Sequence, residues 1–237
     1  MPMRSMIRTA AAALAALTAT MIVAGCGGSP QARSITVTFI RHAQSEANAS
    51  GIIDTEVPGP GLTPEGKGQA EQLAHQLGRK DFDSVYASTM TRAQQTAAPL
   101  AAELGKQVEV LPGIQEIDAG WFNGKPESMA KSTYMLAPVN WLNGDVSDTI
   151  PGSISGKQFN DQFTGAVNKI YNSGHHNPVV FSHMNAIMVW TLLNTQNAKR
   201  SLMDSHPLPN TGRVVISGNP MTGWTLVDWD GIRDFRN

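Results

Sequence analysis

The sequence has very little cysteine and no excess of charge of one sign, and each shortage excludes a class of protein. One cysteine among 237 residues can form neither an internal disulfide nor a cysteine-based zinc site, so core burial must supply the stability. Eighteen basic residues stand against 19 acidic ones, a net charge of -1, which does not suit a nucleic-acid partner. With 41% hydrophobic residues, the chain can form one large domain with a buried core.

The sequence also lacks a long apolar run. Even the apolar run near the N-terminus is too short to make a comfortable transmembrane helix. Arg4 and Arg8 precede an alanine-rich run over residues 10–24, a pattern typical of a secretory signal. The run ends in Val-Ala-Gly-Cys26, which resembles the bacterial lipobox. The resemblance implies a lipoprotein signal peptide over residues 1–25, cleavage before Cys26, and lipidation (for example with palmitate) of its thiol. An exported protein, anchored by lipid to the outer face of the cell membrane, would result. A plain secretory signal with an incidental cysteine is the alternative.

Residues 26–34 are expected to form a flexible tether rich in Gly, Ser and Pro. From residue 35 to 237, strand patterns alternate with helix patterns, which predicts an α/β fold, a three-layer α/β/α sandwich with a mostly parallel central sheet. Thr63 and Pro64 have the residue types of a helix N-cap and first helical position, and Pro99 should kink or shorten the helix around it. The expected strands cover residues 35–40, 84–87, 108–111, 179–181, 213–216 and 224–227.

Residues 120–156 interrupt this alternation with Gly, Pro, Asn, Ser and Met in no clear period. Such a long excursion in a compact domain is usually a lid or binding loop. Its larger side chains either line a substrate pocket or form a small satellite core, and the sequence favours neither: Trp121, Phe122, Tyr134, Met135 and Trp141.

The chemistry-bearing residues lie where predicted strands end. The octet Arg-His-Ala-Gln-Ser-Glu-Ala-Asn over residues 41–48 resembles the signature of the histidine phosphatase superfamily, in its phosphoglycerate-mutase-like branch. Further motifs follow in the order this family has them, at residues 61–70, 88–97, 112–124 and 179–183. Several motifs in order are far more specific than a lone Arg-His pair. The resemblance covers most of the chain after the tether and implies a phosphoglycerate-mutase-like sandwich.

Phosphate-ester hydrolysis needs in-line attack and neutralisation of the equatorial oxygens, and four residues suit these tasks. His42, as a neutral imidazole, can attack phosphorus and form a phosphohistidine. Arg41 and Arg92 can make forked hydrogen bonds to phosphate oxygens. His183 would donate to the phosphoryl group and stabilise its negative charge.

A general acid must protonate the leaving oxygen, and we expect Glu116 to do so, then to activate water as a base. Met184 follows the second histidine, where another branch of the family has an acidic residue, so the acid role falls to Glu116. Asn48 is expected to orient or contact phosphate oxygens. Three other carboxylates near these motifs compete with Glu116 for the acid role: Glu46, Asp118 and Glu127.

These residues predict a metal-independent phosphatase that hydrolyses small phosphomonoesters, with no cofactor and no metal site. Ala43 stands where the family usually has glycine, and Met184-Asn185 where Gly-Gly or Gly-Asn is common. Crowding or backbone strain at Ala43 would reduce activity. The departures therefore leave a second hypothesis open, a catalytically inactive lipoprotein that binds a phosphorylated ligand. A phosphoglycerate-type mutase fits an exported protein less well, because it needs a phosphorylated primer.

Overall fold

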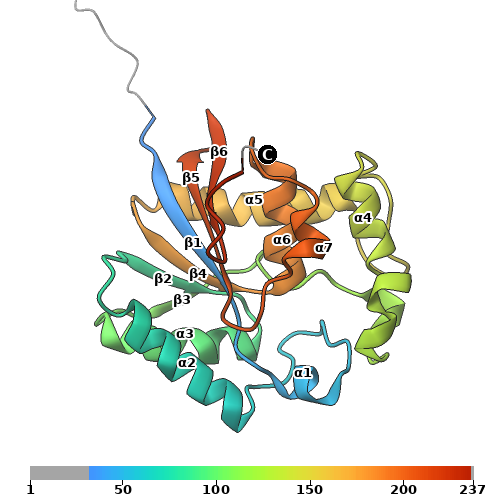
Figure 1. Ribbon diagram of the computed structural model, residues 1–237, viewed down its shortest axis with the longest axis horizontal. Coiled ribbons are helices and arrows are strands. Elements are labelled where there is room, and N and C mark those ends of the chain that lie inside the picture. The colour runs from blue at the N-terminus through green and yellow to red at the C-terminus, as the bar shows by residue number, and fades with distance from the viewer. Residues whose placement is uncertain (1–31, 236–237) are drawn as a thin grey trace, which may run out of the picture. The chain divides into compact units, whose positions relative to one another are not determined.

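The computed structural model of the protein describes residues 32–235. A six-stranded sheet forms the centre of this part (Figure 1). The strand order is β3-β2-β4-β1-β5-β6. Neighbours from β3 to β1 are parallel, whereas β5 is antiparallel to both β1 and β6. The predicted mostly parallel sheet is thus confirmed, with these strands: β1 (Ile35–Arg41), β2 (Ser84–Ala87), β3 (Val108–Val110), β4 (Pro178–Ser182), β5 (Arg213–Asn219) and β6 (Gly223–Trp229).

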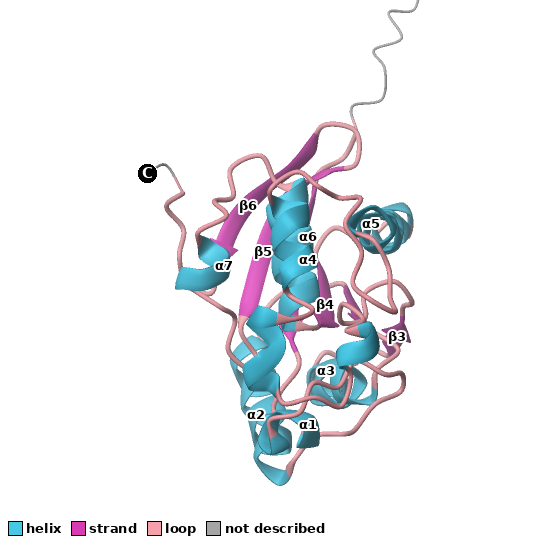
Figure 2. Ribbon diagram, turned by 90° about the vertical axis from the view of Figure 1, so that its right-hand side faces the viewer, coloured by secondary structure: helices cyan, strands magenta, loops and turns pink. Residues whose placement is uncertain are grey.

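Helices cover both faces of this sheet, which gives the three expected layers (Figures 1 and 2). Successive side chains of a strand point to opposite faces. Phe39 accordingly packs in a core with Phe163 and Trp190 of one helical layer, whereas its neighbour Ile40 packs in a second core with Leu73 of the other layer. The helices are α1 (Glu46–Ser50), α2 (Pro64–Leu77), α3 (Thr91–Glu103), α4 (Leu136–Leu142), α5 (Gly156–Asn172), α6 (Met184–Asn194) and α7 (Leu202–Ser205).

Local signals set the start of α2 as the sequence predicts. The Thr63 side chain accepts a hydrogen bond from the Gly66 N–H, and Pro64 occupies the first turn. Of the two effects predicted for Pro99, a kink or a shortened helix, the shortening is wrong, because α3 continues through it to Glu103. Leu100, next to it, is fully buried in the core below α3. Burial of this face offsets the backbone hydrogen bond that proline cannot make.

The excursion over residues 120–156 contains two short 3-10 helices, Gly120–Phe122 and Glu127–Ser132, followed by α4. Trp141 is buried and stacks on Phe159 at 5.7 Å between ring centroids, so this part extends the main core. Met135 is buried in the same core, and Phe122 packs partly against it. Trp121, by contrast, is 76% exposed. The segment is therefore packed structure for most of its length.

The predicted signal peptide, Cys26 and most of the tether lie outside the described residues. Within residues 32–235, none of the helices has the length and apolarity needed to cross a bilayer.

The carboxyl ends of three strands meet at one edge of the sheet. Arg41 of β1 pairs with Ser182 of β4, and Ala87 of β2 pairs with Phe181. The chain leaves β1 towards α2 on one face and leaves β4 towards α6 on the other face. Ligands of open α/β sheets bind where neighbouring strands diverge in this way. The fold thus places the site between the loops that follow β1 and β4.

Candidate active site

His42 directly follows β1, and its two ring nitrogens have different partners. Nδ1 lies 2.7 Å from the carbonyl oxygen of Ala43, which can only accept a hydrogen bond, so Nδ1 carries the proton. Nε2 accepts a hydrogen bond from Nε of Arg92 at 3.1 Å. These two bonds select one neutral tautomer, in which Nε2 presents a lone pair. That lone pair is what an attack on phosphorus requires.

Arg92 enters from the first turn of α3 and is only 3% exposed. Its Nη2 donates to the Asp54 carbonyl oxygen at 3.0 Å, and its Nη1 lies 3.7 Å from Oδ1 of the Asp54 carboxylate. Arg41, at the end of β1, donates through Nη1 to the Leu208 carbonyl oxygen at 2.6 Å. Nε of Arg41 and Nη1 of Arg92 are buried without a hydrogen-bond acceptor. Buried donors of this kind are suited to an anion.

His183 follows β4 and is completely buried. Its Nε2 lies 2.7 Å from Oγ of Ser88, whereas its Nδ1 is buried with no hydrogen-bond partner. The ring centroids of His42 and His183 are 5.1 Å apart. The strand register therefore brings the two histidines, far apart in sequence, into one cluster.

Burial lowers the pKa of His42 well below its ordinary value, and the positive charges of Arg92 and Arg41 add to this effect. Burial likewise lowers the pKa of His183, to which His42 and Arg92 contribute. Both rings are consequently held neutral at physiological pH. A neutral His42 keeps its nucleophilic lone pair, which protonation would remove.

Glu116 lies at the N-terminus of α6. Its Oε1 accepts from the backbone N–H groups of Ile117 and Ala186, both at 2.9 Å, and its Oε2 accepts from Asn185 N–H at 3.3 Å. Unpaired N–H groups at a helix start favour a carboxylate there. Burial nevertheless raises the pKa of Glu116, against the effect of these bonds and of Arg92. A carboxyl group under such opposing influences can exchange a proton, as an acid and base must.

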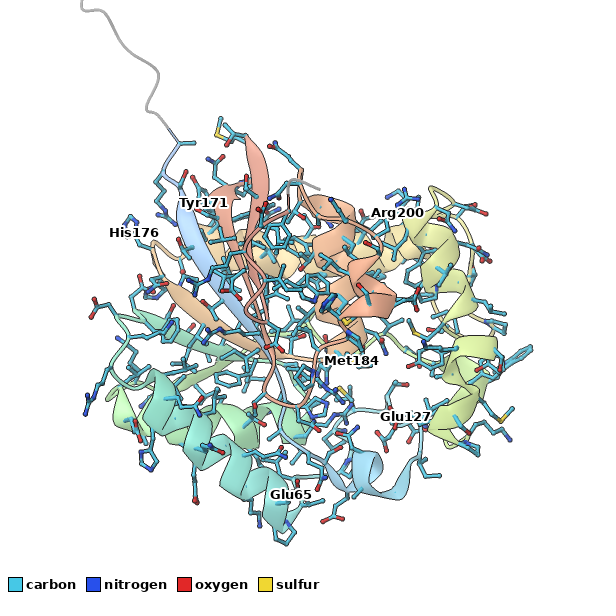
Figure 3. The ribbon with its side chains drawn as sticks, viewed as in Figure 1. Glu65, Glu127, Tyr171, His176, Met184 and Arg200 are labelled. Atoms are coloured by element: carbon cyan, nitrogen blue, oxygen red, sulfur yellow. The ribbon has the colours of Figure 1, made fainter. Side chains whose placement is uncertain are left out.

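These side chains border a small cavity of about 50 Å³. Five of the six predicted site residues in the described chain line it: Arg41, His42, Asn48, Arg92 and Glu116. His183 does not line the cavity and lies next to His42 instead. Met184 and Glu127, both labelled in Figure 3, are also part of the lining. Of the carboxylates that competed with Glu116, Glu46 and Asp118 do not line it.

Ala43 is not strained or crowding in this site. Its φ angle is not positive, so the conformation suits alanine as well as glycine. Its methyl group packs in an apolar cluster with Leu62 and Ala70 and does not line the cavity. Its N–H donates to Oγ1 of Thr96 at 3.0 Å. The replacement of glycine therefore leaves the space in the cavity unchanged.

The sequence prediction gives no role to three residues of the site and leaves a fourth, Tyr134, undecided between pocket and core. Asp54 pairs with Arg92, and Ser88 binds His183. Asn210 donates through Nδ2 to the His42 carbonyl oxygen at 3.1 Å. Tyr134, from the excursion, lines the cavity, and its phenol oxygen accepts from Asn185 at 3.0 Å. Only Ser88 lay within a recognised motif, and Tyr134 was one of several possible pocket residues. Nothing local in the sequence marks Asp54 or Asn210.

A larger groove of about 870 Å³ lies on the other side of Thr55 and Glu116, which border both spaces. Side chains of α5 and the loop after β3 form its walls.

In the described part of the chain, no group of three or more His, Cys, Asp or Glu side chains is placed to hold a metal ion.

Two arginines with buried free donors, beside a neutral imidazole with a lone pair, have the chemistry that a phosphate-handling site needs. Comparison with known proteins agrees with this interpretation. Residues 37–231 match the histidine phosphatase superfamily (branch 1), and the chain belongs to this family.

Sequence similarity to known proteins extends over most of the chain. The chain is 45% identical over 222 residues to the PE-PGRS family protein PE_PGRS11 of Mycobacterium tuberculosis. The aligned region covers 87% of this chain and 38% of that protein. It is 28% identical over 178 residues to putative phosphoserine phosphatase 2 of Hydrogenobacter thermophilus, covering 75% and 87% respectively. A 2-carboxy-D-arabinitol-1-phosphatase of Triticum aestivum is 27% identical over 197 residues, 82% of this chain and 39% of that protein. The chain thus spans well under half of two of these relatives.

Solved structures show the same fold. The mycobacterial glucosyl-3-phosphoglycerate phosphatase Rv2419c superposes with a TM-score of 0.69 at 19% identity, covering 84% of this chain and all of that one. An Escherichia coli protein described as a putative alpha-ribazole-5'-P phosphatase gives a TM-score of 0.66 at 20% identity, covering 84% and 97%.

The buried neutral histidines make a testable prediction about stability and pH. Below the ordinary histidine pKa of about 6.5, the unfolded chain binds protons that the folded protein excludes. The free energy of unfolding should therefore fall on acidification below that pH, by up to about 1.4 kcal/mol per pH unit for each histidine. Urea unfolding at a series of pH values measures this slope.

His42→Asn should make the slope shallower, since it removes one of the two groups. His176→Asn is the control, because His176 is exposed and its side chain makes no hydrogen bond in the structure. Equal slopes in the wild type and in His42→Asn would contradict a neutral buried His42.

Proposed function

We propose that this protein is a metal-independent phosphatase that hydrolyses phosphomonoesters through a phosphohistidine on His42. The observation that carries the proposal is the pair of hydrogen bonds at His42, which places the proton on Nδ1 and the lone pair on Nε2 within reach of Arg92. Phosphatase-named relatives of the same family support the reaction class.

In the first step, Nε2 of His42 attacks phosphorus, and the bond from phosphorus to the ester oxygen breaks. Arg41, Arg92 and His183 stabilise the charge on the phosphoryl oxygens through N–H donors that have no acceptor in the free protein. Binding the phosphoryl group requires Nε of Arg92 to move from Nε2 of His42 to a phosphate oxygen. Glu116 gives its proton to the leaving oxygen.

In the second step, the Glu116 carboxylate takes a proton from water as the water oxygen attacks phosphorus. The bond from Nε2 to phosphorus breaks, and its electron pair returns to the ring of His42. Phosphate leaves, and Glu116 is again protonated. The backbone N–H groups around Glu116 stabilise its charged form between the two steps.

An inactive phosphate-binding protein is the second candidate function, and Met184 is the observation that favours it. Its sulfur lies 3.5 Å from Nη1 of Arg41, within the cavity that a phosphoryl group would enter. A phosphoglycerate-type mutase needs a phosphorylated primer to load His42, and it is the weakest of the three.

For location, we propose that the chain is a lipoprotein, cut before Cys26 and held by its lipid on the outer face of the membrane. The run before Cys26 supports this through its lipobox-like end, and the only thiol of the chain lies at the required position. A tether of residues 26–34 would then separate the lipid from β1, which begins at Ile35.

Turnover should depend on His42 and leave phosphate on it. A reaction quenched within milliseconds is expected to give protein-bound phosphate that is stable in base and labile in acid, because the P–N bond of phosphohistidine hydrolyses in acid. His42→Ala should abolish both the label and turnover, and chelation with EDTA should leave both unchanged. Normal turnover by His42→Ala, or a loss in EDTA that a divalent metal restores, would contradict the mechanism.

Glu116→Gln separates proton donation from phosphate binding. An alkoxide leaves slowly unless it is protonated, whereas p-nitrophenolate is a stable anion without a proton. We expect the variant to slow alkyl phosphate hydrolysis by about 10²- to 10⁴-fold and p-nitrophenyl phosphate far less. Burst kinetics on the second substrate show whether breakdown of phosphohistidine limits both reactions.

Asp118→Asn is the matched control, because it makes the same carboxylate-to-amide change in the same loop, and Asp118 does not line the cavity. Equal losses on both substrates without a burst, or full activity on both, would remove Glu116 from the acid role.

Membrane attachment should depend on Cys26. Cys26→Ala is expected to give an uncut precursor or a protein released from the membrane, whereas the wild type should fractionate with membranes. Metabolic labelling with a fatty acid, followed by membrane fractionation, measures both effects. Unchanged labelling and unchanged membrane association of Cys26→Ala would overturn the lipoprotein proposal.

A further inference from the structure

Three carboxylates line the cavity, and two of them already have partners. Asp54 pairs with Arg92, and Glu116 accepts N–H groups at the start of α6. The third, Glu127, lies at the first position of the second 3-10 helix and is exposed. Within residues 32–235, its carboxylate makes no ion pair and no hydrogen bond to another side chain. Glu127 is thus a formal negative charge at the cavity that acts on Arg41 electrostatically without a direct ion pair.

The backbone holds Glu127 firmly at the rim of the cavity. Its N–H donates to the Gly51 carbonyl oxygen at 2.7 Å. Pro126 forms a β-bridge with Ile52, and the Ile53 N–H donates to the Lys125 carbonyl oxygen at 2.8 Å. Ile52 and Ile53 themselves line the cavity. The position of Glu127 therefore follows from the loop after α1, although its side chain is free to reach a ligand.

Charges of both signs line the cavity: Asp54 pairs with Arg92, and the charge of Glu127 acts on Arg41. Arg41 and Arg92, from β1 and α3, provide the cationic wall that would hold phosphate. Glu127 and Tyr134, from the excursion, face the same space from another side. Burial raises the pKa of Tyr134, and the negative charges of Glu116 and Glu127 raise it further.

The exposed lysines of the excursion do not neutralise Glu127. Lys131 instead lies 3.5 Å from the carboxylate of Asp204. Lys125 takes part in the bridge to Ile53 through its backbone, and its side chain makes no ion pair in the described chain. Arg41 is the cation whose charge acts on Glu127, but no direct ion pair joins the two side chains in the described chain, so the carboxylate can still pair with a cationic group of a ligand.

We propose that Glu127 selects phosphomonoesters whose leaving group carries a positively charged nitrogen close to the ester oxygen, that is, phosphates of short amino alcohols. The inference rests on the phosphatase function proposed above and specifies its substrate class. Phosphate occupies the arginine wall, and the ammonium group of the same molecule pairs with Glu127. A leaving group that carries only a carboxylate is repelled by this charge.

This selectivity differs from what some relatives' names describe. Glucosyl-3-phosphoglycerate and 2-carboxy-D-arabinitol 1-phosphate are both carboxylates with no ammonium group. Phosphoserine, in the name of another relative, carries an ammonium group and a carboxylate. Only the last of these substrates offers Glu127 a partner.

Three two-carbon esters test the proposal, because they differ mainly in the charge of one end: 2-aminoethyl phosphate, 2-hydroxyethyl phosphate and phosphoglycolate. The full chain should have its highest kcat/KM on the first and its lowest on the last. Glu127→Gln should lower the ratio of the first to the second by about two- to fivefold, the range expected for an exposed ion pair. Glu127→Lys should lower this ratio further and favour phosphoglycolate.

Glu109→Gln is the control, since it removes the same charge from an exposed position on the edge strand β3, outside the cavity. Its ratios should equal those of the wild type. If Glu127 were instead the general acid, Glu127→Gln would slow both alkyl esters equally and leave their ratio unchanged. That result, or a preference for phosphoglycolate in the wild type, would overturn the proposal.

Calorimetric binding of the three esters to His42→Ala distinguishes this proposal from the proposed function. The variant should bind 2-aminoethyl phosphate more tightly than 2-hydroxyethyl phosphate, and adding Glu127→Gln should remove the difference. A wild type that turns over no ester, yet shows this order of affinity, contradicts the phosphatase function alone. Turnover of p-nitrophenyl phosphate with no charge preference in binding or in kcat/KM contradicts the role of Glu127 alone.

Discussion

The site depends on keeping the His42 ring neutral, with its proton on Nδ1. The bond to the Ala43 carbonyl oxygen places that proton, and Nε of Arg92 approaches the opposite nitrogen. Two nearby arginines and full burial remove any tendency of the ring to gain a second proton. This arrangement requires β1, β2 and β4 to end at the same level, since residues that follow each of these strands belong to the cluster around His42. The parallel register of these strands therefore brings together the groups that surround His42.

Glu116 is subject to a different balance. Burial favours its protonated form, whereas three backbone N–H groups favour its carboxylate form. A residue that acts first as an acid and then as a base has to be stable in both forms. The start of α6 supplies two of these N–H groups, and the preceding residue of the chain is His183. The helix that follows β4 thus positions the second histidine and the carboxyl group together.

The proposed phosphate-binding groups and the proposed selectivity residue come from different parts of the chain. Residues at or just beyond strand ends, such as Arg41 and His42, line the cavity, and the excursion between Gly120 and Gly156 supplies Tyr134 and Glu127 to the same lining. Part of that excursion is fixed to the main core by Trp141, and another part is bridged to the loop after α1. Changes within it could alter which leaving group is accepted without moving the arginines or histidines.

The sequence by itself determined the family, the mostly parallel sheet and the residues at the ends of its strands, because strand patterns and motifs are local in the chain. Pro99 shows where local rules stop, since burial of α3 outweighs the missing hydrogen bond. Only the tertiary structure decided that Asp54 pairs with Arg92, that Asn210 reaches His42, and that Ala43 faces an apolar cluster. It likewise brought Glu127 rather than Glu46 or Asp118 to the cavity. The physical reason is that these contacts join segments distant in sequence, whose meeting depends on strand order and on the packing of the excursion.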